Sequence, residues 1–187
     1  MVRNNRKMIL KTVQLAILTA LVVVLQCISI PLGATAINLA LLPVVIGAAM
    51  CGVWAGCWLG FISGATILIS QQAAWFFTIN PIATVIVVLV KGTLSGLAAG
   101  LVYTVLAKRH KYLAVIFAGL AAPLVNTGIF ILGCCTLFYA DFVQYGNVFV
   151  WVVTTFVALN FPIEIGINMV FSPTVVRIID VVKKNKS

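Results

Sequence analysis

The segment from Pro81 to Ala107 reads PIATVIVVLVKGTLSGLAAGLVYTVLA, and Lys91 is its only charged residue. A helix needs about 20 mostly apolar residues to cross a bilayer, so this segment is long enough. The rest of the chain is similar, because 63% of its 187 residues are hydrophobic and 8% are charged. A compact domain of this size cannot hide so much apolar surface from water. The sequence therefore predicts an all-α integral membrane protein.

Six apolar segments are interpreted as membrane-spanning helices of a single domain, residues 1–187. Pro31 and Gly33 end the first segment, and Pro43 interrupts the short second one. Pro81 is well placed to begin the fourth, since proline is favoured in the first turn of a helix. We expect the sixth to bend at Pro162. The predicted spans are residues 12–30, 37–50, 53–70, 81–107, 112–138 and 148–179.

All basic residues except Lys91 fall in three short clusters outside the deep parts of the spans. Lys and Arg accumulate on the cytoplasmic side of membrane proteins. Six crossings place all three clusters on one side, so we expect both termini to be cytoplasmic, and nucleic-acid binding is disfavoured. The clusters are Arg3, Arg6, Lys7 and Lys11; Lys108, Arg109 and Lys111; and Arg177, Lys183, Lys184 and Lys186.

Small residues recur at every fourth position on three of the predicted spans. Such ridges let two helix backbones approach closely in lipid. Each ridge favours packing within the protein, and an outward-facing ridge would instead contact a partner subunit. The ridges are Gly52, Gly56, Gly60 and Gly64 on the third span, Gly92, Gly96 and Gly100 on the fourth, and Ala16 and Ala20 on the first.

Lys91 and Glu164 are charged residues predicted to lie deep within spans. A charge at that depth costs about 3 kcal/mol on insertion scales and marks a functional candidate. On a helix, Lys91 shares a face with Thr84 and Ser95 and points away from the glycine ridge, which favours an ammonium group that holds a substrate anion. A buried Lys91–Glu164 pair would satisfy both charges without a ligand. Both interpretations remain open.

Four further polar or aromatic residues are candidates for a binding site. Pro123 is expected to break the fifth span, and Asn126 beside it either satisfies the freed backbone or binds a polar ligand. The loop between the third and fourth spans is predicted to lie outside. Its residues Gln72, Trp75 and Asn80 are candidates to cap a pocket, although Trp75 also suits the interfacial aromatic belt.

The sequence holds no pattern typical of a metal centre or a membrane protease. His110 is the single histidine and lies in a basic loop, and the five cysteines form no CxxC pair. Neither an HExxH sequence nor a Walker A sequence occurs. We expect no metal, no cofactor and no ATPase activity of the chain itself. A lipid-modifying enzyme that uses Lys91 or Glu164 as acid or base, and an accessory subunit without ligand, remain alternatives.

Three segments resemble a known transporter family. They are Ala16-Ile-Leu-Thr-Ala20 in the first span, INLALLPVVIG from Ile37 to Gly47, and APLVNTGIF from Ala122 to Phe130. Together with six spans in a short chain, they are similar to the substrate-binding S component of an energy-coupling factor (ECF) vitamin transporter. The likeness extends over essentially the whole chain and is nearest to the pantothenate type.

The resemblance implies a vitamin-binding subunit of a prokaryotic plasma membrane. Such a subunit binds its vitamin near the outer face and topples against a transmembrane coupling subunit, which two cytoplasmic ATPase subunits drive. Ala16 and Ala20 would contact the coupling subunit, while Lys91 and Asn126 would bind the vitamin. Because amides rather than a flat aromatic stack are predicted near Lys91, we expect a flexible monocarboxylate such as pantothenate, and biotin remains open.

Overall fold

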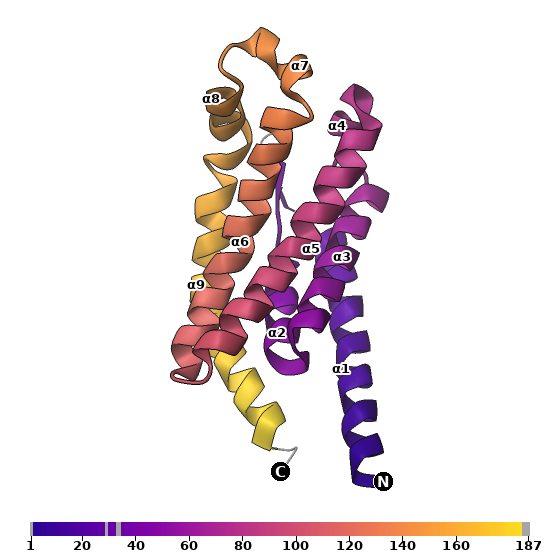
Figure 1. The fold of residues 1–187 in the computed structure, drawn as a ribbon, viewed down its shortest axis with the longest axis vertical. Helices are drawn as coiled ribbons and strands as arrows, with labels where there is room; N and C mark the ends of the chain where they lie inside the picture. Colours follow the sequence, from indigo (N-terminus) through magenta and orange to yellow (C-terminus); the bar gives the residue numbers. More distant parts are fainter. Residues whose placement is uncertain (1, 29, 33–34, 185–187) are drawn as a thin grey trace.

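The computed structural model describes residues 2–28, 30–32 and 35–184 and is a bundle of helices with one short β-hairpin (Figure 1). Among the described residues, four helices are long and apolar enough to cross a membrane. They are α1 (Val2–Cys27), α5 (Pro81–Leu106), α6 (Lys111–Thr136) and α9 (Asn160–Lys184). The predicted second and third spans correspond to two shorter apolar helices, α2 (Leu41–Cys51) and α3 (Val53–Ile69).

The first helix is longer at its start and shorter at its end than the predicted span. α1 is already helical at Val2, before the predicted start at residue 12, and the arginines and lysines of this part are good helix formers. It ends at Cys27, and an antiparallel hairpin of β1 (Ile30–Leu32) and β2 (Thr35–Ile37) follows. Pro31 biases the residue before it towards extended backbone, which accounts for the early end. Gly33, predicted to help end this span, lies outside the described residues.

The predicted loop between the third and fourth spans contains a short helix, α4 (Ala74–Ile79). Asn80 follows it and caps α5, because its Oδ1 accepts a hydrogen bond from the backbone N–H of Ala83 at 3.1 Å. Pro81 occupies the first position of α5, as the sequence predicts.

The predicted sixth span is not one bent helix. Within residues 148–179 the chain forms α8 (Val148–Val152) and a π-helical turn (Val153–Val157) before α9 begins. The predicted loop before this span contains α7 (Tyr139–Phe142) and a 3₁₀ turn (Val143–Tyr145). The break lies at Ala158 and Leu159, one turn before the expected bend at Pro162. Pro162 has no N–H to donate to the carbonyl four residues earlier, so the helix is interrupted on its N-terminal side.

The glycine ridges of α3 and α5 pack against each other. A β-carbon on Gly56 would lie 2.5 Å from the carbonyl oxygen of Gly96, and one on Gly60 would overlap that of Gly92. The two backbones are therefore in direct contact, as expected for small residues spaced by one turn. Gly52 is an exception to the predicted ridge, because it makes the turn between α2 and α3 with a φ of 107°.

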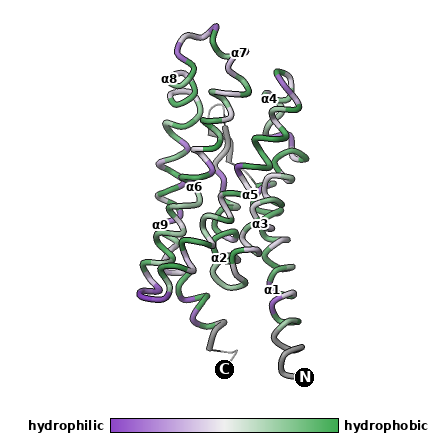
Figure 2. The backbone as a smooth tube through the Cα atoms, in the orientation of Figure 1, coloured by the Kyte–Doolittle hydropathy of each residue, from purple (hydrophilic) through white to green (hydrophobic). Residues whose placement is uncertain are grey.

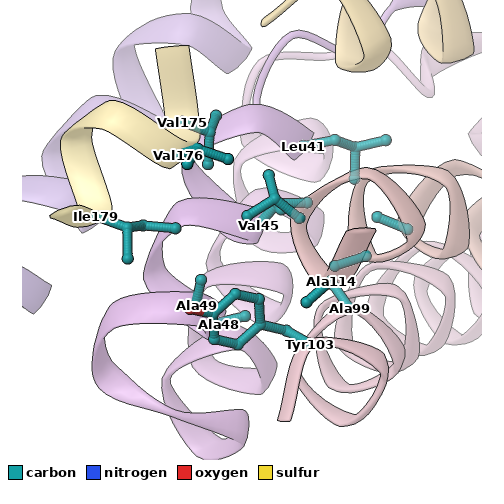
Figure 3. Close-up of a cluster of buried hydrophobic side chains, with 13 residues drawn as sticks. Leu41, Val45, Ala48, Ala49, Ala99, Tyr103, Ala114, Val175, Val176 and Ile179 are labelled. Carbon is teal, nitrogen blue, oxygen red and sulfur yellow. The ribbon is translucent and has the colours of Figure 1, made fainter. Parts of the chain in front are cut away.

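α2 lies at the centre of one half of the bundle, where it contacts α1, α3, α5, α6 and α9. Figure 3 shows Val45 and Ala48 of α2 between Val176 of α9 on one side and Ala99 and Tyr103 of α5 on the other. These side chains are buried and mostly small. This half of the bundle is consequently a closed apolar core.

Both chain ends and the turn between α5 and α6 lie at one end of the bundle, and α4, α7 and α8 lie at the other (Figure 1). Lys108 and Arg109 are exposed in that turn, which is hydrophilic in Figure 2, whereas most of the helical segments between the ends are hydrophobic. The three segments that carry the basic clusters in the sequence thus lie at one end of the bundle. Lys186 lies outside the described residues.

Candidate functional site

A cavity lies in the half of the bundle that carries α4, α7 and α8. The centre of a water molecule can move through about 110 Å³ of it, whereas a single bound water requires roughly 10–15 Å³. The cavity therefore has room for a small organic molecule. Its polar lining consists of Gln26, Asn38, Gln72, Thr84, Lys91, Asn126, Thr127, Asn160 and Glu164.

Lys91 is a cation that faces this cavity. The glycine side of α5 is packed on α3, so Lys91 is turned away from that contact, as the sequence predicts. Its Nζ lies 5.2 Å from the ring centre of Phe130 on α6, within the range of a cation–π interaction. Within the described part of the chain, Nζ has no hydrogen bond and no ion pair within 4.0 Å. Its three hydrogen-bond donors are therefore available to a ligand.

Glu164 lies across the site on α9 and is 5% exposed. The backbone N–H of Asn38, directly after β2, donates to Glu164 Oε1 at 3.2 Å. The side-chain amide of Asn168 donates to the backbone carbonyl of Glu164 at 2.8 Å. The contact with Asn38 joins the segment before α2 to the last helix and fixes the direction of the carboxylate.

Lys91 and Glu164 line the same cavity without forming a direct ion pair. Their charged atoms lie more than 4.0 Å apart, although the two charges interact across the cavity. The structural pair that the sequence leaves open is thus not formed in the described chain. Each group is instead presented to the cavity from a different helix.

Gln72 is held in the cavity wall by hydrogen bonds to the end of α1. Gln26 Nε2 donates to Gln72 Oε1 at 2.8 Å, and Gln72 Nε2 donates to the backbone carbonyl of Gln26. Ser63 Oγ on α3 donates to Gln26 Oε1 at 2.9 Å. This network joins α1, α3 and the turn before α4, and it keeps the buried amide of Gln26 satisfied.

The proline in the fifth predicted span does not break it. α6 runs from Lys111 to Thr136 with Pro123 inside, so the expected break is wrong. Neighbouring helices on both sides hold this segment, and the fully buried Ser95 of α5 donates to the carbonyl of Ala122 at 3.0 Å. Asn126 is buried and lines the cavity, whereas Ser95 points to α6 and not to the cavity.

Phenylalanine rings, rather than hydroxyl groups, form much of the remaining wall. Thr84 reaches the cavity, but its Oγ1 donates to the carbonyl of Asn80 at 2.7 Å. Phe76 of α4 packs against the rings of Phe130 and Phe156, with centroid distances of 5.6 and 5.4 Å. Amides line the cavity as expected, whereas the expectation that no aromatic surface lies near Lys91 is wrong. The phenylalanines that line the cavity are Phe76, Phe130, Phe138, Phe156 and Phe161.

Two of the predicted site residues do not line the cavity. Trp75 is 46% exposed, stacks on Phe142 at a centroid distance of 5.9 Å and contacts Trp151. Its ring thus packs against other aromatic rings and does not line the cavity. The side chain of Asn80 caps the start of α5. The sequence already indicates this role, because asparagine is favoured at the N-cap and proline at the next position. Lys91, Asn126, Gln72 and Glu164 are the predicted residues that come together at the cavity.

Gln26 and Asn38 line the cavity but were missed by the sequence interpretation. Gln26 follows an apolar run and carries no motif, and Asn38 falls within the segment from Ile37 to Gly47 without a role of its own. Asn38 is 9% exposed, and its Oδ1 is buried without a hydrogen-bond donor among the described residues. A buried acceptor without a partner is uncommon in proteins and calls for an explanation.

The predicted docking residues Ala16 and Ala20 lie on a free side of α1. Both are exposed, whereas Leu18 and Val22 turn inward against α2 and α3. Among the described elements, α1 has its main contacts with α2 and α3. The small-residue pair on this helix is therefore not used for packing within the described chain.

Comparison with models of known protein families gives a match. The family model described as "ECF transporter, substrate-specific component" matches residues 8–176. No curated protein and no solved structure matches the chain. The matched region extends from the first turns of α1 into the second half of α9 and includes every residue that lines the cavity. The chain therefore belongs to the family of substrate-specific components of ECF transporters.

Proposed function

We propose that this chain binds a small organic carboxylate, pantothenate in the first place, for import by an ECF transporter. Members of the family are transporter subunits rather than enzymes, and they work with a membrane coupling subunit and ATPases. The observation that carries the proposal is Lys91, whose ammonium group faces a cavity and has no hydrogen-bonded partner in the described chain.

The charge of Lys91 is unfavourable within the membrane unless a ligand compensates it. A lysine in the interior of a membrane-spanning helix costs about 3 kcal/mol on insertion scales. Phe130 offers its ring face at 5.2 Å, which compensates part of this cost but supplies no acceptor. A carboxylate in the cavity would accept up to three hydrogen bonds from the ammonium and neutralise it. A ligand with an anionic group would therefore compensate the charge of Lys91 best.

The remainder of the ligand would contact both amides and aromatic rings. Gln72 and Asn126 offer donors and acceptors, and Phe76, Phe130 and Phe156 supply an apolar wall. Pantothenate, with a carboxylate, an amide, hydroxyls and two methyl groups, suits this lining. Biotin and carboxylates with a small ring suit it as well, because a ring can pack against the phenylalanine wall.

The two alternatives from the sequence are less well supported. Membership in a family of transporter subunits speaks against a lipid-modifying enzyme. A cavity into which two helices direct Lys91 and Glu164 supports a ligand-binding subunit over an accessory subunit without ligand.

We further propose a six-span domain in a prokaryotic plasma membrane, with both termini cytoplasmic. The gathering of the basic clusters at one end of the bundle supports this orientation. The cavity, in the opposite half, would then lie on the outer side. The exposed pair Ala16 and Ala20 on α1 would contact the coupling subunit.

The test is equilibrium binding by the detergent-purified protein. Mass spectrometry identifies any small molecule that copurifies, and calorimetry then measures pantothenate, biotin, nicotinate and thiamine. We expect a carboxylate to bind with high affinity and the cationic thiamine to bind at least 100-fold more weakly. Tight binding of thiamine, or binding of none of the four, would contradict a site for carboxylate vitamins.

A further inference from the structure

We infer that Asn38 and Glu164 form a second subsite, opposite Lys91, that accepts hydrogen bonds from the substrate. The substrate would then be bifunctional, with a carboxylate at Lys91 and a hydroxyl or N–H group at Asn38 and Glu164. This inference rests on the proposed function and narrows its substrate class.

The first observation is the side chain of Asn38. It lines the cavity, is 9% exposed, and its Oδ1 has no donor among the described residues. Burying a carbonyl oxygen without a hydrogen bond is unfavourable, so native structures rarely leave one in this state. A donor on a bound molecule would satisfy it, and a bound molecule without a donor would leave it unsatisfied.

The second observation is the carboxylate of Glu164, which also lines the cavity. Its Oε1 accepts a hydrogen bond from the backbone N–H of Asn38 at 3.2 Å, while its Oε2 accepts none from the described chain. The same residue, Asn38, therefore orients the carboxylate through its backbone and contributes an unpaired acceptor through its side chain. This hydrogen bond holds Asn38 and Glu164 next to each other in the wall of the cavity.

The third observation is the charge distribution of the cavity. Lys91 contributes a cation from α5, Glu164 contributes a carboxylate from α9, and their charged atoms are more than 4.0 Å apart. A ligand that is only an anion would gain from Lys91 but would be repelled by Glu164. A ligand with a hydrogen-bond donor at its other end would donate to the carboxylate of Glu164. A hydrogen bond to a charged acceptor is strong and would offset the repulsion.

The decisive variant is Asn38→Leu, because it removes the side-chain acceptor at similar size and keeps the backbone N–H that donates to Glu164. Calorimetry would compare pantothenate, which has hydroxyl and N–H donors, with nicotinate, a carboxylate that has no donor. For the wild type we expect nicotinate to bind at least 100-fold more weakly than pantothenate. Asn38→Leu should weaken pantothenate binding about tenfold and leave nicotinate binding unchanged.

Two further measurements identify the donor and separate this inference from the proposed function. Glu164→Gln keeps an acceptor without charge, so it should cost less than tenfold for the neutral donors of pantothenate. For β-alanine, whose donor is an ammonium group, it should cost 100-fold or more. Lys91→Met should weaken pantothenate and nicotinate by equal factors, because both carry a carboxylate.

The outcomes distinguish the two proposals. If nicotinate binds the wild type as tightly as pantothenate, and Asn38→Leu changes neither affinity, the second subsite is wrong while the carboxylate site at Lys91 stands. If none of pantothenate, biotin and nicotinate binds, or Lys91→Met changes the affinity of none of them, the carboxylate site itself is wrong and the second subsite fails with it. A selective loss of pantothenate binding in Asn38→Leu, with circular dichroism unchanged, supports the second subsite.

Discussion

A β-carbon on Gly60 would overlap the carbonyl oxygen of Gly92, so α3 and α5 touch backbone to backbone at this point. Gly56 and Gly96 repeat the contact one turn away. In lipid, association of helices relies on such close packing, because the surrounding acyl chains are as apolar as the side chains. The contact also orients the cavity-lining side of α5, since it determines which way Lys91 faces.

The first prediction concerns this contact. Gly60→Ala should destabilise the protein by about 2–3 kcal/mol, because the added methyl group forces two backbones apart. Gly128→Ala on α6 is the matched control, since outside the adjoining backbone of α6 no atom lies within 4 Å of its β-carbon position. Alanine favours a helix over glycine by roughly 1 kcal/mol, so the control should be as stable as the wild type or more stable. Thermal unfolding in detergent compares them, and equal melting temperatures for the two variants would contradict the packing.

The second prediction concerns Lys91. Lys91→Met should weaken the binding of a carboxylate vitamin by roughly 100- to 1,000-fold, since each decade corresponds to about 1.4 kcal/mol. Lys111→Met is the control, because Lys111 is 56% exposed and pairs with Asp180 at 3.5 Å on the surface. The control should leave affinity unchanged and alter stability by less than about 1 kcal/mol. Calorimetry with pantothenate measures the affinities.

Thermal unfolding of Lys91→Met separates a binding role from a structural one. Removing one partner of a buried ion pair typically costs about 3–5 kcal/mol of stability. Lys91 has no such partner within 4.0 Å in the described chain, so the ligand-free variant should be at least as stable as the wild type. A large loss of stability would mean that Lys91 and Glu164 support the fold as a pair.

The third prediction concerns the network of Gln26. Gln26→Leu leaves the polar groups of Ser63 and Gln72 without their partner, which should cost about 1–3 kcal/mol of stability. Ligand affinity should fall as well, because Gln72 then loses its fixed place in the wall. The control is Thr93→Val, whose hydroxyl donates only to Leu89 within the same helix. Thermal unfolding with and without ligand measures both effects.

Patterns within one segment of the sequence predict those features of the fold that depend on residues close together in the chain. Glycine at every fourth position predicts that α3 and α5 can pack closely, because residues four apart share one face of a helix. The same spacing cannot show that Gly52 is used for a turn, since its φ of 107° is a property of the junction and not of the repeat. Pro123 illustrates the opposite error, because neighbouring helices keep α6 continuous around it.

The polar wall of the cavity depends on contacts between distant parts of the chain. Gln26 and Gln72 are 46 residues apart, and Asn38 and Glu164 are 126 residues apart. The periodicity of residues within one segment cannot predict a hydrogen bond between two distant segments. Lys91 and Glu164 were predictable because a charge is conspicuous within an apolar span. The place of Phe76 in the cavity wall was not predictable, because a phenylalanine is equally suited to face lipid or to line a cavity.

The last prediction concerns Ala16 and Ala20, which are exposed on α1 and which we propose as the contact with the coupling subunit. Replacing both with leucine should leave ligand binding unchanged, because α1 contributes Gln26 to the cavity and these positions face away from it. Uptake should be lost, because the larger side chains keep the coupling subunit's helices from approaching closely. The measurement is uptake of radiolabelled pantothenate by vesicles that contain the complete transporter.

The control replaces both alanines with serine, which keeps the side chains small. This variant should transport at close to the wild-type rate, so a loss of uptake confined to the leucine variant would identify size as the cause. Pull-down of the coupling subunit by each variant then distinguishes failed assembly from failed turnover. Uptake by the leucine variant at the wild-type rate would show that Ala16 and Ala20 face lipid throughout the transport cycle, and the docking contact would have to be sought on another exposed face.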